Sequence, residues 1–502
     1  MSATIADVLR SALRHRPDAP AVVARSGPLT YAGLDRAASA AAGAMWRLGV
    51  RPGDRVAACL PNDLDVVVAF HGTQRIGAIW VGINEAFARD EQQALADLAA
   101  PSLILAGPRS QARGGIVLVT GEWARLIADA LVPPTVETGQ DAPAGIAFTS
   151  GTTGIPKGIV HSQRNMLLPG EVLVRTRGWG PGLRKGDCLP LTLLNMLILT
   201  TLLVAQAEGC CVLMDRRDVP GVAEWIGRER VTVWNGVPAQ LYDLARQPGL
   251  DLSSLEEAWC GGAGCPDELR RSFEEAHPIP VRATYGLTEA PTVVAIDPVG
   301  GPTRPGASGR VLPHLDVAAY DETGRRRPAG ATGELRISAA TEGEWAGAWT
   351  PALGEWRDGS VVPVAGGPVA TGDIGSVDAD GWLTVVDRRK LVIMRGGADV
   401  YPAEVERVIR LHPAVAEVAV FGVPDERLGQ KVAALVQLGA EIDPSELEAQ
   451  LVALCRQHLA RYKVPEVWSA VDGFPVNAMG KIIRTRLPGL LAQNPALGRP
   501  RG

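Results

Sequence analysis

Short apolar runs rich in β-branched residues alternate with amphipathic stretches through the first three-quarters of the chain. Each run has the length of a buried strand, and the stretch between two of them at residues 63–77 has the apolar spacing of a helix. Such alternation favours parallel sheets with helices on both faces. The runs that predict strands are residues 55–61, 79–83, 102–107, 115–120, 144–150 and 231–238.

The pattern changes twice further along the chain. Around residues 310–340, β segments punctuated by glycine predict a barrel-like β part. After Asp387 strands and helices follow one another closely, as in a small α+β domain. We therefore predict an α/β fold in which a large N-terminal domain of parallel sheets flanked by helices (1–386) is followed by a boundary at 387–391 and an α+β domain at 392–502, which is a usual domain size.

One segment has the length of a membrane span, because residues 188–207 carry no charge over 20 positions. It contains Pro190, Asn195 and Gln206 together with threonines, and no second such segment accompanies it. These features favour a buried helix inside the large domain. We therefore expect no membrane span.

Length and charge narrow the class of protein further. A chain of 502 residues exceeds one ordinary core, so two or more domains are expected. Its net charge of −5 provides no basic surface for nucleic acid, and its seven cysteines lack the spacing of metal ligands. The N-terminus has no apolar signal core, so we expect a cytoplasmic protein. We also expect it to be a monomer or a homodimer.

A loop rich in glycine and hydroxyl residues follows the predicted strand at 144–150. Glycines let backbone N–H groups approach an oxyanion, and hydroxyls add further donors, so the loop is typical of phosphate binding. It does not match a Walker A loop, because Pro156 replaces the second glycine and Gly158 replaces the metal-binding hydroxyl. The predicted phosphate loop comprises Thr149, Ser150, Gly151, Thr152, Thr153, Gly154 and Lys157.

Six further motifs follow this loop in order. In chain order they are Gly261-Gly262-Ala263, Tyr285-Gly286-Leu287-Thr288-Glu289, Thr371-Gly372-Asp373, Asp387-Arg388-Arg389-Lys390, Gly396-Gly397 with Tyr401-Pro402-Ala403-Glu404-Val405-Glu406, and Asn477-Ala478-Met479-Gly480-Lys481-Ile482. With this set the chain resembles, over nearly its whole length, the adenylate-forming superfamily of acyl- and aryl-CoA synthetases, peptide-synthetase adenylation domains and luciferases.

The resemblance implies ATP-dependent activation of a carboxylic acid to an acyl-AMP. It assigns Lys481 as the catalytic lysine that bridges the carboxylate and the α-phosphate. Thr288 is expected to donate to the α-phosphate and Glu289 to bind Mg²⁺, which prefers oxygen ligands. The nucleotide-binding residues it implies are Gly261, Gly262 and Ala263 against adenine, Tyr285 stacked on adenine with Gly286 beside it, and Asp373 and Arg388 at the ribose.

The resemblance also implies a second half-reaction with CoA. Lys390 lies at the expected hinge, about which the C-terminal domain would rotate after adenylation. Arg395, Gly396 and Gly397 would then line the tunnel for the pantetheine thiol. The role of His161, four residues after Lys157, stays open between a phosphate contact and a structural histidine.

The acyl pocket departs from the usual family pattern. Leu193 stands where many relatives carry a gating histidine or aromatic residue, and no acidic residue occurs between Asp187 and Glu208 to pair with an amino acid's ammonium group. We therefore expect a hydrophobic aliphatic, alicyclic or aryl acid. The expected pocket residues are Leu193, Leu194, Asn195, Trp234, Asn235, Gly236, Val237 and Gly262.

Two alternatives to an acyl-CoA ligase follow from the same residues. Leu391 and Gln430 depart from the Asp and Glu of many CoA ligases, so the acyl group could pass to a carrier-protein phosphopantetheine or a separate partner. A catalytically dead nucleotide-binding scaffold is the weaker alternative. It is disfavoured because Lys481, Glu289, Asp373 and the phosphate loop are all present.

Overall fold

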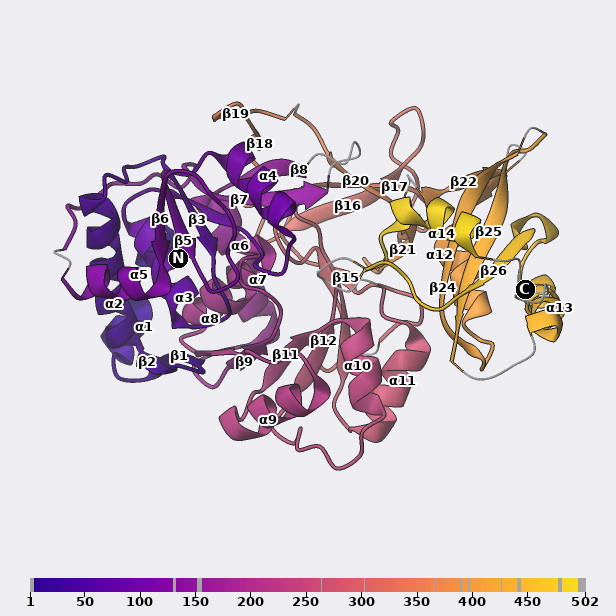
Figure 1. Ribbon diagram of the computed structural model, residues 1–502, viewed down its shortest axis with the longest axis horizontal. Coiled ribbons are helices and arrows are strands. Elements are labelled where there is room, and N and C mark those ends of the chain that lie inside the picture. Colours follow the sequence, from indigo (N-terminus) through magenta and orange to yellow (C-terminus); the bar gives the residue numbers. More distant parts are fainter. Residues whose placement is uncertain are drawn as a thin grey trace. The chain divides into compact units, whose positions relative to one another are not determined.

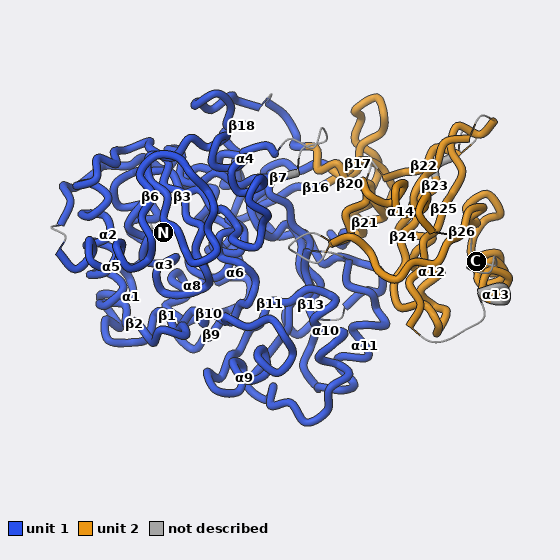
Figure 2. Tube along the Cα trace, viewed as in Figure 1, with its two compact units in different colours: residues 1–317, 336–369, 379–383 blue, residues 318–335, 370–378, 384–502 orange. Residues whose placement is uncertain are grey.

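The computed structural model divides the chain into two compact units (Figure 2). Unit 1 comprises residues 1–317, 336–369 and 379–383, and unit 2 comprises 318–335, 370–378 and 384–502. Unit 2 thus includes the segment after the predicted boundary at 387–391 and two earlier segments. The predicted hinge itself stays a prediction. The structure describes residues 4–129, 132–150, 156–262, 264–301, 303–364, 366–388, 391–395, 398–425, 427–439, 444–476 and 481–494.

Nine described strands of the first half of the chain and its middle form one sheet of unit 1, with a parallel centre and antiparallel pairs at both edges (Figure 1). In sheet order they are β15 (Arg310–Val311), β14 (Ala295–Ile296), β13 (Val281–Tyr285), β12 (Glu257–Cys260), β11 (Val233–Gly236), β9 (Arg184–Asp187), β10 (Cys210–Leu213), β1 (Pro20–Ala24) and β2 (Gly27–Thr30).

Eight described strands form the second sheet of unit 1. It contains the five strands that the sequence predicts before residue 151, and its parallel part runs from β7 to β6. In order they are β19 (Ser360–Val362), β18 (Gly354–Arg357), β8 (Pro156–Ser162), β7 (Pro143–Ser150), β4 (Ile79–Gly82), β3 (Arg55–Cys59), β5 (Leu103–Ala106) and β6 (Ile116–Val119).

Helices between the strands complete unit 1. The predicted helix at 63–77 is found as α3, whose first residue follows the capping side chain of Asp63. The described helical elements are η1 (Ile5–Asp7), α1 (Arg10–His15), α2 (Tyr31–Arg47), α3 (Leu64–Arg75), α4 (Arg89–Ala99), α5 (Thr120–Ala128), α6 (Gln163–Arg177), α7 (Leu194–Leu197), η2 (Ile198–Leu202), α8 (Leu203–Gln206), α9 (Val219–Glu229), α10 (Pro238–Ala245) and α11 (Asp267–Ala276).

The sequence predicts a buried helix in the charge-free segment 188–207, and a buried helical run is found over residues 194–206 of it. It consists of α7, a π-helical turn η2 and α8, and nearly all of its side chains are buried. In the part of the chain that the structure describes, none of the helices is both long and apolar enough to cross a membrane.

Most residues of a four-stranded sheet and all of a five-stranded sheet belong to unit 2. The apolar faces of α12 and α13 pack on the five-stranded sheet in a core that includes Val405, Val420 and Leu451. The strands are β16 (Leu315–Tyr320), β17 (Gly333–Ala339), β20 (Val369–Val377) and β21 (Leu383–Arg388), then β23 (Ala398–Val400), β22 (Ile393–Arg395), β25 (Gly429–Leu438), β24 (Val415–Asp425) and β26 (Val467–Val471); the helical elements are α12 (Pro402–Ile409), α13 (Pro444–His458), η4 (Arg461–Lys463), η5 (Arg484–Arg486) and α14 (Leu487–Gln493).

The predicted mixed α/β class is therefore confirmed, with parallel sheets, flanking helices and a C-terminal α+β part. The sequence pattern did not reveal β23, β26 or α14. Each of these elements is short, and none shows a sustained apolar period.

Candidate active site

The predicted phosphate loop joins the two antiparallel strands β7 and β8. Thr149 pairs with Lys157, and Ser150 pairs with Pro156. A Walker A loop leads from a strand into a helix, so this connection is of a different kind. Between the two strands, Gly151, Thr152, Thr153 and Gly154 lie outside the residues that the structure describes, as does the Ser150 side chain.

Lys157 lies near the start of β8, which pairs with strand β18. Its Nζ is 3.2 Å from Oε1 of Glu355, and its side chain remains about half exposed (47%). Burial acts to raise the pKa of Glu355, but hydrogen bonds and positive charge from Lys157 and Arg357 bring that pKa below its ordinary value. Lys157 is therefore held in place by a carboxylate while its ammonium group stays accessible to a phosphate.

His161, further along β8, is fully buried, and its Nε2 lies 2.8 Å from the carbonyl oxygen of Thr288. Burial lowers the pKa of His161 to about 4, so the ring is neutral near pH 7. The carbonyl only accepts, so Nε2 carries the proton and donates. The question left open by the sequence is answered in favour of a contact to the backbone between two predicted catalytic residues, Thr288 and Glu289.

The segment that carries Thr288 and Glu289 leaves the end of β13 at Tyr285 and has no regular secondary structure. Gly286 is required there, because a Cβ atom at this position would lie 1.7 Å from the carbonyl oxygen of Thr292. Thr292 itself has a positive φ of 73°, which is uncommon for a β-branched residue. The chain then returns as β14, where Ala295 pairs with Tyr285.

The first glycine motif follows β12, the parallel neighbour of β13. A Cβ atom at Gly261 would lie 2.4 Å from Oγ1 of Thr284, and Gly262 has a φ of 77° and is exposed. Ala263 lies outside the described residues. The carboxyl ends of β12 and β13 therefore bring Gly261, Gly262 and Tyr285 to one edge of the sheet, where open α/β sheets bind their ligands.

The predicted ribose-binding residues meet within unit 2. Nε of Arg388 lies 3.2 Å from Oδ1 of Asp373, whose side chain is 5% exposed while that of Arg388 is 66% exposed. The backbone N–H of Asp373 donates to Oγ1 of Thr371, and that hydroxyl in turn donates to the carbonyl of Leu335. The backbone at Asp373 is thus fixed, and an ionised carboxylate is an acceptor suited to hydroxyl groups.

Lys481 also belongs to unit 2 and interacts electrostatically with both residues of this pair. Loss of hydration lowers the pKa of Lys481, the charge of Arg388 lowers it further, and Asp373 acts in the opposite direction. A lysine, an arginine and a carboxylate that are far apart in sequence are therefore brought together. This is the arrangement expected for a site that binds anionic reactants.

The predicted thiol tunnel is described only in part. Arg395 forms a two-point ion pair with Glu466, with Nη2–Oε1 and Nε–Oε2 distances of 2.7 and 3.0 Å. Gly396, Gly397 and the predicted hinge residue Lys390 lie outside the residues that the structure describes. Their roles stay predictions.

Most of the expected acyl-pocket residues lie on α7 and β11, while Leu193 precedes α7, Val237 is the N-cap of α10 and Gly262 follows β12. Nδ2 of Asn235 lies 3.6 Å from Sδ of Met196, so α7 passes over this face of β11. Trp234 points to the other face, into the core formed with α9, α10 and α11, where Gly236 leaves room for its ring. The structure thus brings Leu194 and Asn195, on α7, and Leu193 before it to one side of β11, and places Trp234 on the opposite side.

Comparison with known proteins relates this site to a family. Residues 9–341 match the family described as AMP-binding enzyme, and residues 404–481 match the AMP-binding enzyme C-terminal domain. A long-chain-fatty-acid–CoA ligase of Mycobacterium tuberculosis is 32% identical over 91% of this chain and 92% of that protein. A feruloyl-CoA synthase of Amycolatopsis sp is 34% identical over 94% of this chain and 96% of that protein.

Among solved structures, the crystal structure of ATP-bound MatB from Rhodopseudomonas palustris is 26% identical and has a TM-score of 0.86. The match covers 98% of this chain and 99% of that chain.

The chain belongs to the AMP-binding enzyme family.

Its type within the family is the AMP-forming acyl- or aryl-CoA synthetase, as the resemblance in sequence predicts. Family membership accounts for the order of the motifs. The structure also contains a buried charged cluster that joins β9 to the π-helical turn η2. Lys185 and Asp187 on β9 are both fully buried, with Nζ 2.5 Å from Oδ2 of Asp187, to which Thr200 of η2 also donates at 2.6 Å.

Sequence reasoning on this AMP-binding enzyme missed these residues and the partner of His161. Lys185 and Asp187 alternate along a strand, which is a signal that both face the same side. Two charged residues on one face of a strand ordinarily indicate that this face is exposed to solvent. The sequence pattern therefore predicts exposure here, whereas both side chains are buried. The structure shows that this face is covered, because Thr200 on the π-helical turn donates to Asp187 and both charged side chains are fully buried.

Proposed function

We propose that the enzyme joins a hydrophobic carboxylic acid to AMP, with release of pyrophosphate, and then transfers the acyl group to the thiol of CoA. The observation that carries this proposal is the grouping of Lys481, Asp373 and Arg388 in unit 2. An ammonium beside a ribose-binding carboxylate suits a reaction between two anions, because it offsets the repulsion between the acid and the α-phosphate.

In the first half-reaction a carboxylate oxygen of the acid attacks the α-phosphorus of ATP. The new C–O–P linkage forms as the bond to pyrophosphate breaks, and pyrophosphate leaves with the electron pair. Lys481 remains protonated and stabilises the developing charge, while the Thr288 hydroxyl donates to an α-phosphate oxygen. Lys157 and the phosphate loop are the proposed ligands of the leaving phosphates.

The residues present fit a magnesium ion of the kind that accompanies ATP. In the described ranges no group of three or more His, Cys, Asp or Glu side chains could hold a metal ion by itself. Mg²⁺ usually requires only one or two protein carboxylates, because substrate phosphates and water supply the other oxygen ligands. Glu289 is the carboxylate that would hold it. When bound, the ion neutralises phosphate charge.

The acid is proposed to be aliphatic, alicyclic or aryl because the expected pocket offers no free carboxylate. Asp187, at the edge of this segment, is already paired with Lys185 and Thr200. A substrate ammonium buried there would lack a partner. The two relatives named above support the same class, since their names specify a long-chain fatty acid and ferulic acid.

In the second half-reaction the thiol sulfur attacks the acyl carbonyl, and AMP leaves as the thioester forms. CoA is the proposed acceptor because both named relatives are CoA ligases. A carrier-protein phosphopantetheine is the second candidate, favoured by the departures at Leu391 and Gln430. The Gln430 side chain accepts the backbone N–H of Met394 at 2.8 Å and therefore has a structural role here.

Mass spectrometry of the products tests this function. The enzyme is incubated with ATP, Mg²⁺ and a panel of fatty, alicyclic, aryl and amino acids, each with and without CoA. Acyl-AMP without CoA and acyl-CoA with it are expected for hydrophobic acids. Preferential turnover of an amino acid would contradict the proposed substrate class, and acyl-AMP that accumulates despite CoA would favour a carrier-protein acceptor.

A further inference from the structure

The chain immediately after Lys481 is tied to unit 2 by backbone contacts. Ile482 pairs with Val476, and the backbone N–H of Ile483 donates to the carbonyl of Pro475 at 2.8 Å. Ile482 also packs against a small apolar core that includes the buried Leu487. The chain direction at Lys481 is therefore set by the residues that follow it.

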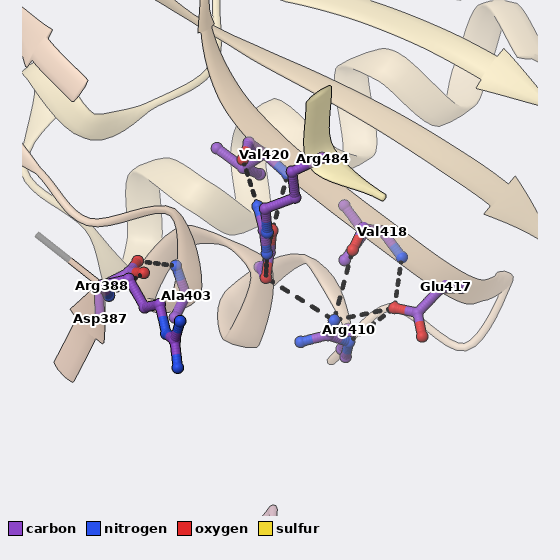
Figure 3. A network of polar contacts seen from close by, with 9 residues as sticks. Asp387, Arg388, Ala403, Arg410, Glu417, Val418, Val420 and Arg484 are labelled. Atoms are coloured by element: carbon purple, nitrogen blue, oxygen red, sulfur yellow. Dashed lines mark hydrogen bonds and ion pairs between the residues drawn. The ribbon is translucent and has the colours of Figure 1, made fainter. Parts of the chain in front are cut away.

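Arg484, three residues after Lys481, makes three polar contacts within unit 2 (Figure 3). Its Nη2 lies 2.8 and 3.1 Å from the two carboxylate oxygens of Glu406, and its Nη1 donates to the carbonyl of Val420 at 2.8 Å. These contacts connect η5 with the helix α12 and the strand β24. They are charge-assisted and mostly shielded from water, so they are stronger than a surface ion pair.

The Glu406 side chain is held in place and has, among the described residues, no second cation as close as Arg484. Its side chain is 5% exposed, and its Oε1 also accepts the backbone N–H of Val420 at 2.8 Å. The next cation, Arg410, lies 3.8 Å away and is engaged with Glu417 at 2.8 Å. A buried carboxylate that loses its partner is strongly destabilised, so Glu406 holds Arg484 in one place.

The N-terminal end of the same helix is attached to the strand that carries Arg388 (Figure 3). Oδ2 of Asp387 accepts the backbone N–H of Ala403 at 2.7 Å, and its Oδ1 accepts the N–H of Arg388 at 2.6 Å. Ala403, which is bonded to Asp387, and Glu406, which is paired with Arg484, both lie on α12, an element of only eight residues. The helix therefore fixes the Arg388 strand and the Lys481 segment to a common support.

We propose that Arg484, held by Glu406, is the positioning residue that places the Lys481 ammonium beside Asp373 and Arg388 for adenylation. This inference rests on the proposed function, in which Lys481 acts in acyl-AMP formation. Arg484 touches no reacting atom in this proposal. It acts by restricting where the backbone of residues 481–484 can lie, and a displacement of about 1 Å at a reacting group can cost about a hundredfold in rate.

The two half-reactions separate this role from a purely structural one. Lys481 is required for acyl-AMP formation and has no proposed role in the attack of the thiol. A misplaced Lys481 should therefore slow adenylation and spare thioester formation from supplied acyl-AMP. A general loss of folding would lower both rates by the same factor.

The test uses the full-length enzyme with Arg484→Lys, which keeps the charge but loses the second nitrogen, and with Glu406→Gln, which keeps an acceptor for Val420. Pyrophosphate release with ATP and acid measures adenylation, and CoA thioester formation from acyl-AMP measures transfer. We expect adenylation to fall about tenfold or more in both variants, with transfer within about twofold of the wild type. Arg410→Leu, which alters the exposed neighbour of Glu406, is the matched control and should leave both rates unchanged.

Each remaining outcome decides the question. If adenylation and transfer fall equally in Arg484→Lys and Glu406→Gln, the pair is only structural and the inference is wrong. The inference is also wrong if neither rate changes. The double variant should lose no more adenylation than the worse single variant, because the two side chains act as one unit. Lys481→Ala, measured in parallel, tests the proposed function separately, since adenylation that survives in it would overturn the role of the lysine itself.

Discussion

One hydrogen bond from the His161 ring reaches the peptide group that joins Thr288 to Glu289. That peptide is planar, so a carbonyl held at 2.8 Å also fixes the direction of the Glu289 N–H on its other side. The Cα atoms of Thr288 and Glu289, which carry the two side chains, also lie in this peptide plane. A fully buried histidine can therefore influence Thr288, the predicted donor to the α-phosphate, and Glu289, the proposed metal ligand, together.

Replacing His161 by leucine should raise the KM for MgATP about tenfold, because a tenfold change corresponds to about the net free energy of one hydrogen bond. His161→Gln, which restores a donor, should recover most of the loss. The kinetics of pyrophosphate release measure both. Because the pKa of His161 is about 4, the neutral ring should not contribute to the pH dependence near neutrality.

A second buried histidine provides the matched control for this change. Nε2 of His277 lies 3.1 Å from the carbonyl of Leu244, in the same unit but away from the predicted nucleotide residues. His277→Leu should lower the melting temperature to a similar degree without changing the KM. An equal rise in KM in both variants would show that the effect of His161 is on folding alone.

We expect Lys481 to give adenylation an alkaline limit. In the proposed mechanism the ammonium form is the active one, so activity should be present below the pKa of Lys481 and be lost as the pH rises through it. That pKa is lowered by lost hydration and by Arg388, so the limit should lie below the ordinary lysine value. Arg388→Gln should move it to higher pH in rates measured at saturating ATP from about pH 7 to about pH 10. A limit that does not move would contradict this electrostatic contribution.

At the scale of helices and strands, most of the strands that the sequence predicted are largely buried, although the predicted strand β6 is mostly exposed. β3, β4, β5 and β7 are nearly continuous apolar runs, and this composition is typical of parallel strands covered by helices. Strand β9 was not predicted, because its sequence Arg184–Asp187 contains three charged residues in four positions. Only tertiary contacts, from Thr200 to Asp187, make such a strand compatible with burial.

In the candidate site, too, the features that depend on tertiary contacts could not be predicted from the sequence. Motif residues such as Gly261 and Gly286 could be predicted from the motifs to which they belong, and the structure leaves no room for a side chain at either position. The partners Glu355 and Glu406 could not be predicted as partners, because the contacts they make depend on how distant strands and helices meet. Sequence therefore identified the groups expected to touch substrate, and the structure identified the groups that hold them.

A buried ionic cluster joins α6 to β12 and gives a prediction for stability. Nε of Arg177 donates to Oε1 of Glu257 at 3.0 Å, Trp259 donates to the same oxygen at 2.9 Å, and Arg282 lies 3.4 Å from Oε2. Glu257→Ala would leave two buried guanidinium groups without their carboxylate. We expect the free energy of unfolding, measured by urea denaturation, to fall by about 3–5 kcal/mol.

An exposed ion pair of the same chemical type serves as the control for the Glu257 experiment. The side chains of Arg175 and Glu344 are 63% and 56% exposed. Glu344→Ala should leave the denaturation midpoint nearly unchanged, because solvent screens such pairs. Similar losses in both variants would contradict the role given to burial.

At the scale of the whole molecule, the prediction concerns the succession of the two half-reactions. Lys390, outside the described residues, is the predicted pivot. Proline would fix its φ angle and remove its N–H, so Lys390→Pro should leave adenylation intact and slow thioester formation about tenfold or more. Separate measurement of pyrophosphate release and acyl-CoA formation tests this, and an equal loss of both would count against a pivot at this residue.

Unit 2 is assembled from three stretches of the chain, and this has a consequence for recombination between relatives. A single crossover near residue 384 would transplant Lys481 and Arg388 into a new host but leave Asp373, on the stretch 370–378, to the recipient. A chimera made in this way inherits its predicted catalytic lysine and its predicted ribose carboxylate from different parents. A junction upstream of Asp373 transfers all three residues, so it is the position of the junction that determines whether the donor's predicted nucleotide-binding group is inherited whole.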